Sequence, residues 1–163
     1  MKNATDSAAS LPSFESEVRV CSIARTLDLV GEKWSLLAVR ELMFGNHRFD
    51  QIVRRTGAPR DVLTTRLRKL EASGLVERVQ YQDRPPRFEY RLTDAGWSLM
   101  PIITVLRAWG DTHLAGPDGP PIAFRHECGA ILRTAVACGA CGGTVEPGSV
   151  VRVESSDAGP PID

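Results

Sequence analysis

The chain has 163 residues, of which 42% are hydrophobic and 25% are charged, and its formal net charge at pH 7 is zero. This length allows one good hydrophobic core with a small appendage but not two full-sized domains, and the composition is typical of a soluble globular protein. Zero net charge argues against a surface covered in positive potential, so an anionic partner must be met by a local patch.

The N-terminal stretch MKNATDSAASLPSFESE has neither the basic segment nor the apolar segment of a secretory signal. No window of the sequence is apolar for the length that a membrane span requires. We therefore expect a cytoplasmic protein with no membrane partner. Residues 1–16 are rich in small and polar side chains, which predicts a flexible tail.

Three short segments then carry apolar residues at helical spacing. Gly31 separates the first two predicted helices, Gly45 ends the second, and Gly57 with Pro59 ends the third. The apolar positions are Ile23, Leu27 and Val30, then Leu36, Leu37, Val39 and Leu42, and finally Phe49, Ile52 and Val53.

The next segment, APRDVLTTRLRKLEASG, predicts an amphipathic helix that ends at Gly74. Leu63, Leu67 and Leu70 fall at i, i+4 and i+7, which commits one stripe to the core. The opposite face must then carry polar side chains, and these are Arg60, Asp61, Thr64, Thr65 and Arg68.

Two alternating runs, LVERVQYQ and RFEYRLT, predict a hairpin joined by the turn-forming DRPP. Thr93 is the expected N-cap of a long last helix, which Pro101 should kink or restart. The order of these elements predicts an α+β, mainly helical fold, with a winged helix-turn-helix domain over residues 17–114. The last helix is more apolar than one face of a small domain needs, through Leu99, Ile102, Ile103, Leu106 and Trp109.

Residues 48–91 hold 11 Lys and Arg against 6 Asp and Glu, an excess of five positive charges. Arginine reads guanine edges in the major groove, threonine reads bases with more tolerance, and arginines at a wing meet phosphate or the minor groove. Exposed arginines on one helix are most often solvated surface, but the topology and the basic hairpin tip together favour double-stranded DNA as the partner. The predicted DNA contacts are Arg54, Arg55, Arg60, Thr64, Thr65, Arg68, Arg84 and Arg87.

After a linker at residues 115–121, residues 122–153 predict a small β-rich module, and residues 154–163 a flexible tail. The module carries His126, Cys128, Cys138 and Cys141 as H-x-C-x9-C-x2-C, a spacing that suggests Zn2+ in a zinc-ribbon-like knuckle. The alternative is a metal-free hairpin module, with incidental cysteines or a disulfide between Cys138 and Cys141. In either case the module is expected to help hold a dimer or a small-molecule effector.

Three stretches closely resemble the HxlR-type winged helix-turn-helix transcriptional regulators of bacteria: CSIARTLDLVGEKWSLLAVRELMFGNHRFDQI, VLTTRLRKLEASGLVER and YQDRPPRFEYRLTDAGWSL. The resemblance implies a homodimer that reads a palindromic operator and is joined through its first and last helices. The interface residues would be Ile23, Leu27, Leu99, Ile102, Ile103, Leu106 and Trp109. In some members a cysteine at the position of Cys21 acts as a redox or electrophile sensor, whereas a buried apolar role for Cys21 is the alternative.

These observations predict a sequence-specific DNA-binding transcriptional regulator that acts as a homodimer and responds to redox state or to a ligand. The alternative is a zinc-ribbon-containing adaptor for protein or RNA that uses the winged helix only to dimerise. An enzyme is not expected. The sequence has no glycine-rich phosphate loop and no nucleophile-base motif around His47 or His113.

Overall fold

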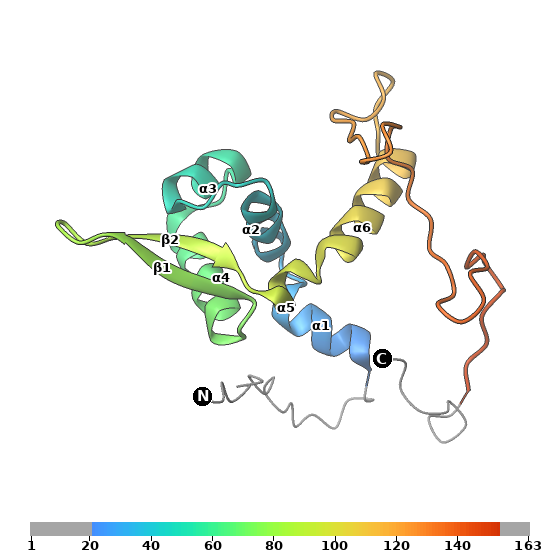
Figure 1. Ribbon diagram of the computed structural model, residues 1–163, viewed down its shortest axis with the longest axis horizontal. Helices are drawn as coiled ribbons and strands as arrows, with labels where there is room; N and C mark the ends of the chain where they lie inside the picture. The colour runs from blue at the N-terminus through green and yellow to red at the C-terminus, as the bar shows by residue number, and fades with distance from the viewer. Residues whose placement is uncertain (1–20, 154–163) are drawn as a thin grey trace, which may run out of the picture. The chain divides into compact units, whose positions relative to one another are not determined.

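The computed structural model describes residues 21–153, so the tails predicted at 1–16 and 154–163 lie outside the described residues. Six helices and one hairpin follow the predicted order (Figure 1). The elements are α1 (Ser22–Val30), α2 (Lys33–Met43), α3 (Phe49–Thr56), α4 (Arg60–Ala72), β1 (Val76–Gln82), β2 (Arg87–Leu92), α5 (Asp94–Trp97) and α6 (Met100–His113). The winged helix-turn-helix prediction is confirmed.

The core of this fold is built around α4, as the leucine stripe predicts. Leu63, Leu67 and Leu70 are all fully buried. They belong to one apolar cluster with residues of α2, α3 and the hairpin, among them Val39, Leu42, Ile52, Val76 and Leu92. Because one stripe of α4 is fixed inside this cluster, its opposite face is fixed outside it.

The hairpin pairs β1 with β2 in antiparallel register, from Val76 opposite Leu92 to Gln80 opposite Phe88. The register shifts between Gln80 and Gln82, where the pairing approaches the loop. Figure 1 shows the loop end of the hairpin projecting beyond the helices. The opposite end is anchored by the buried side chains of Val76 and Leu92.

The long last helix predicted after Thr93 is divided into α5 and α6. The Thr93 hydroxyl caps α5 by accepting the backbone N–H of Gly96 at 3.2 Å. A Cβ atom at Gly96 would lie 2.1 Å from the carbonyl oxygen of Leu75, so only glycine fits where α5 packs against the start of β1. The chain restarts as a helix at Met100, and Pro101 lies in its first turn, where a missing N–H leaves no hydrogen bond unmade.

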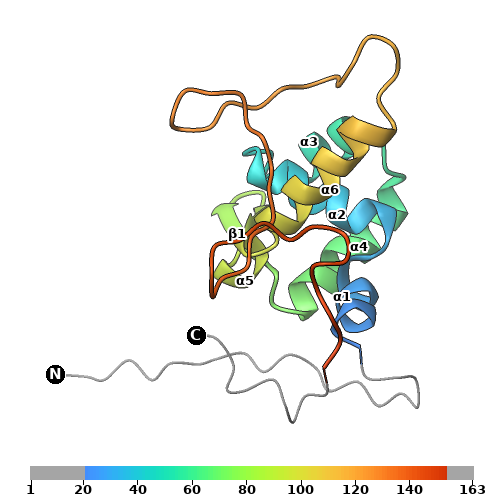
Figure 2. The same cartoon turned by 90° about the vertical axis from the view of Figure 1, so that its right-hand side faces the viewer.

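The chain divides into two compact units after Ile103, within α6. Beyond α6, the described residues 114–153 form loops closed by three isolated β-bridges (Figure 2). Within these residues, which include the predicted β-rich module, no strand is longer than a single bridge. The linker boundary predicted at residues 115–121 stays a prediction. No helix in the described part of the chain is long and apolar enough to cross a membrane.

Candidate nucleic-acid interface

The turn between α3 and α4 sets the direction of α4. Gly57 ends α3 in the left-handed conformation, with φ of 71°, which glycine adopts without steric cost. Ala58 is buried in the core, and Pro59 precedes the first residue of α4. The turn is therefore anchored on its inner side, and it delivers α4 with Arg60 as its first helical residue.

An ion pair joins the beginnings of α3 and α4. The Arg60 Nη1 atom lies 2.7 Å from the Asp50 Oδ1 atom, and the Arg60 guanidinium lies 4.9 Å from the Phe49 ring centre. Both charged side chains are well exposed, so the pair contributes little to stability. It does hold the guanidinium beside the N-terminal end of α4.

The two threonines of α4 use their hydroxyl hydrogens within the helix. Thr64 donates to the Arg60 carbonyl at 2.7 Å, and Thr65 donates to the Asp61 carbonyl at 3.0 Å. Each threonine then retains a methyl group and an acceptor oxygen, a combination that suits a thymine methyl or a base amino group. Arg68 is exposed one turn further on and has no ion-pair partner among residues 21–153.

Other basic side chains of the segment have structural partners. Arg66 pairs with Glu32, and the Lys69 ammonium lies 4.0 Å from the same carboxylate. Glu32 immediately precedes α2, so these contacts tie α4 to the start of that helix. The Arg91 guanidinium lies 2.6 Å from the Glu89 carboxylate within β2. The positive excess is therefore not uniform, and the predicted set excludes these three residues.

The exposed side of α3 contributes Arg54 and Arg55, which line a shallow depression of about 320 Å3. Asn46 and Gln51 line it too, and sequence reasoning missed both. Gln51 lies three and four positions before the two arginines, so the helical spacing could have identified it. The depression combines two cations with two amides, which suits a phosphate oxygen.

Arg84 and Arg87, predicted at the wing, are both exposed at the loop end of the hairpin. The hairpin is connected to the helices through two hydrogen bonds of His47. Its backbone carbonyl accepts the Tyr90 N–H at 2.8 Å, and its ring Nδ1 lies 3.1 Å from the backbone carbonyl oxygen of Tyr90. Arg48, missed by the sequence analysis, places its guanidinium 4.9 Å from the Tyr81 ring centre. It adds an exposed charge between α3 and the wing.

The structure separates the predicted dimer residues by burial. Ile23 and Leu27 on α1 and Ile102 on α6 are exposed, and so are Leu106 (53%) and Trp109 (55%) on α6. Leu99 is only 7% exposed and belongs to the core cluster, and Ile103 packs partly against that cluster. Leu99 is thus placed within the protomer core because α5 and the start of α6 close over the hairpin end.

Cys21 occupies the N-cap position of α1 and is half-buried. Cys128, Cys138 and Cys141 are exposed free thiols. Backbone N–H groups of Ala140 and Cys141, together with the Cys141 thiol, lower the pKa of Cys138 because they stabilise its thiolate.

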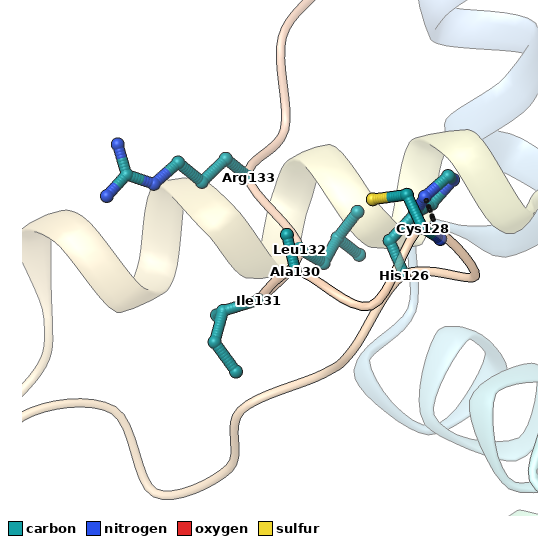
Figure 3. Close-up of a pocket in the computed structure, with 6 residues that line it drawn as sticks. All are labelled: His126, Cys128, Ala130, Ile131, Leu132 and Arg133. Carbon is teal, nitrogen blue, oxygen red and sulfur yellow. Dashed lines mark hydrogen bonds between the residues drawn. The ribbon is translucent and has the colours of Figure 1, made fainter.

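The predicted zinc ligands lie as two local pairs. Cys138 and Cys141 share one turn, and the Cys128 N–H donates to His126 Nδ1 at 3.3 Å in another (Figure 3). Within residues 21–153, no three His, Cys, Asp or Glu side chains come together as a metal-binding group. The fit to zinc is therefore incomplete in this arrangement.

Residues 29–117 match the family described as HxlR-like helix-turn-helix. The chain is 48% identical over 130 residues to a Mycobacterium tuberculosis protein named "Uncharacterized HTH-type transcriptional regulator Rv3095", covering 79% of this chain and 80% of that protein. These relatives give no support to the adaptor alternative.

Solved structures agree with the sequence relatives. PA1607, proposed to be a transcription factor, superposes with a TM-score of 0.74 at 30% identity, over 85% of this chain and 97% of that one. The reduced form of the redox regulator HypR superposes with a TM-score of 0.54 at 35% identity, over 58% of this chain and 94% of that one. The likeness of sequence and of fold leads to one conclusion: the chain belongs to the HxlR-like helix-turn-helix family.

Proposed function

We propose that the protein is a transcriptional regulator that binds double-stranded DNA sequence-specifically in the cytoplasm, as a homodimer on a palindromic operator. The observation that carries the proposal is the outer face of α4. Arg68 is exposed there and has no ion-pair partner among the described residues. The same helix carries Thr64 and Thr65, whose methyl groups and acceptor oxygens are available. The sequence and structural relatives described as transcriptional regulators support it.

We propose different roles for different side chains. The outer face of α4 enters the major groove, where Thr64, Thr65 and Arg68 meet base edges. Arg60 contacts phosphate or base after it leaves Asp50, an exchange that costs little because the pair is exposed. Arg54 and Arg55 on α3, and Arg84 and Arg87 on the wing, bind the phosphate backbone and fix the register.

A second copy of the chain would cover the exposed apolar residues of α1 and α6. Ile102, Leu106 and Trp109 recur at i, i+4 and i+7 and share one face of α6. Helix α6 has no buried residue within the protomer, although most of its side chains are apolar. A helix with an apolar face that its own chain leaves exposed fits a homodimer interface.

Titration of a selected operator with Arg68→Ala protein tests the base-reading role. We expect a loss of about 1–3 kcal/mol on the preferred sequence and a smaller loss on random DNA. Lys69→Ala is the matched control on the same helix, since the Lys69 ammonium faces Glu32, and it should bind like wild type. Arg84→Ala and Arg87→Ala should weaken all sequences alike and reduce the salt dependence. Unchanged affinity in all three arginine variants would contradict the assignment.

Cys21 is the proposed redox sensor of this regulator. The support is its position at the N-cap of α1, a helix with exposed Ile23 and Leu27, together with the similarity to the redox regulator HypR. Oxidation at this point would alter the proposed interface and with it the spacing of the two recognition helices. Mild peroxide should change the DNA affinity of wild type and leave Cys21→Ser unchanged, and equal responses would assign Cys21 to packing alone.

The zinc ribbon of the C-terminal unit remains a proposal that rests on ligand chemistry. His126, Cys128, Cys138 and Cys141 are suitable zinc ligands, but they lie in two separate turns. Elemental analysis of protein purified without added metal, wild type beside Cys138→Ser, tests it. Near-stoichiometric zinc that is lost in the variant would support the site, and its absence from reduced wild type would favour the metal-free module.

A further inference from the structure

A cavity of about 290 Å3 lies within the second unit, between the last turns of α6 and residues 120–134. This volume is at the lower end of the range for small-molecule sites. The cavity is walled on one side by α6 residues from Arg107 to Thr112 and on the other by residues from Pro120 to Thr134. Neither the DNA contacts nor the proposed dimer face uses these walls.

Two charged side chains of α6 are fixed at the cavity. Arg107 Nη1 lies 3.0 Å from Asp111 Oδ2, and both side chains are about three-quarters buried, at 25% and 24% exposure. The Arg107 guanidinium also lies 4.7 Å from the Phe124 ring centre. A carboxylate accepts from one N–H of this guanidinium and an aromatic ring packs against the group, so it is immobilised before any ligand arrives.

Thr134 supplies a second polar feature. Its Oγ1 atom is buried and has no hydrogen-bond partner among the described residues. An unpaired buried hydroxyl costs about 1–3 kcal/mol, so a native site normally satisfies it. Thr134 lines the cavity, and a rotation of its side chain would turn the covered hydroxyl toward a polar atom placed there.

The remaining wall is largely apolar. Ile122, Phe124 and Leu132 line it together with the helix residue Ala108. Figure 3 shows how the segment alternates: Leu132 lies on the side of His126 and Cys128, whereas Arg133 points away from them. Arg133 lines the cavity as well, so the lining holds two guanidinium groups and one carboxylate.

We propose that this cavity binds a small monoanionic molecule with an apolar body, such as an aromatic carboxylate. The excess of one positive charge in the lining accepts one anionic group, the Thr134 hydroxyl donates to it or to a neighbouring oxygen, and the apolar wall covers the body. That this ligand would control DNA affinity rests on the proposed function. Binding of the ligand itself does not, and it can be measured without DNA.

Calorimetric titration of the full chain without DNA tests the site with three probes. Benzoate carries both the charge and the ring, benzyl alcohol lacks the charge, and acetate lacks the ring. We expect saturable binding of benzoate, at least about tenfold tighter than either of the others, because each of those loses a charge-assisted hydrogen bond or an apolar body. Absence of saturable benzoate binding, or equal binding of benzyl alcohol, would overturn the proposal.

Substitutions in the cavity lining test whether benzoate binds at this site. Arg107→Gln should weaken benzoate about tenfold or more, and Arg107→Lys should restore part of the affinity because it restores the charge. Thr134→Val should weaken benzoate about two- to tenfold while leaving the ligand-free protein at least as stable, since it removes an unsatisfied hydroxyl. Thr144→Val, outside the cavity, is the matched control. Benzoate affinity that is unchanged in both Arg107→Gln and Thr134→Val would place the ligand elsewhere and overturn the assignment.

Discussion

The two units of this chain are stabilised in different ways. The first contains every buried apolar side chain of the described residues, from Val30 to Leu99. In the second, no described residue reaches that degree of burial. Apolar burial is the dominant favourable contribution to folding, so the winged helix can fold on its own core, whereas the second unit depends on other contacts.

Local hydrogen bonds take the place of a core in the second unit. The His126 N–H donates to the Ala130 carbonyl at 2.9 Å, and the Leu132 N–H donates to the Phe124 carbonyl at 2.8 Å. Gly129 and Gly142 adopt positive φ at the turns. Such bonds contribute about 0.5–1.5 kcal/mol each, so a few of them hold a loop without fixing a cooperative domain. A ligand or a partner would therefore stabilise this unit more than it would the winged helix.

Matched truncations in the two units should differ strongly in their effect on stability. Leu67→Ala removes a fully buried side chain and should lower the free energy of unfolding by about 2–5 kcal/mol. Ile131→Ala removes an exposed side chain and should cost less than about 1 kcal/mol. Urea unfolding of the full chain, followed by circular dichroism at the helix band, measures both. Equal destabilisation would mean that the second unit has a core of its own.

The same contrast explains how much of the fold could be predicted. Helical spacing of apolar residues identified the stripe of α4 because Leu63, Leu67 and Leu70 all enter one core. Pro101 predicts a kink or restart of the last helix, and α6 begins beside it at Met100. The close approach of Gly96 to the Leu75 carbonyl could not be predicted, because it is a tertiary contact with no periodic pattern. Where burial organises the chain, periodicity is informative, and where local contacts do, it is not.

The candidate DNA site was predictable to the same extent. Exposed positions of α4 follow from its buried stripe, so Thr65 and Arg68 could be placed on the outer face. The pairing of Arg66 with Glu32 could not be predicted, because 34 residues separate the partners. Leu99, grouped with the dimer residues from its sequence alone, lies in the core because the chain folds back over the hairpin end.

Helix α6 contributes residues to both units, and its exposed apolar face is the proposed dimer interface. Leu106→Asp or Trp109→Asp would place a charge in the proposed dimer interface and should weaken association by about 2–4 kcal/mol, with loss of tight operator binding. Val151→Asp is the control, since Val151 is also apolar and is more exposed but lies in the loops of the second unit. Sedimentation at micromolar concentration measures the association. A wild-type protein that is monomeric at this concentration would contradict the proposed dimer interface.

The smallest expected effect concerns Cys138, where a loop of the second unit alters a thiol without burying it. Backbone N–H groups of Ala140 and Cys141 lower the pKa of Cys138, so its thiolate should be present at lower pH than in an ordinary cysteine. Alkylation by iodoacetamide, followed site by site with peptide mass spectrometry, should therefore begin at lower pH for Cys138 than for a model thiol peptide. Ala140→Pro removes the first of these donors and should move the profile of Cys138 toward higher pH, whereas Ala140→Gly keeps the N–H and should leave it in place. The sign follows from the bond, because a donor lost from the thiolate disfavours the charged form. If the two variants show the same pH profile, the backbone N–H of residue 140 does not stabilise the Cys138 thiolate. Local hydrogen bonds would then contribute less to the stability of the second unit than its structure indicates.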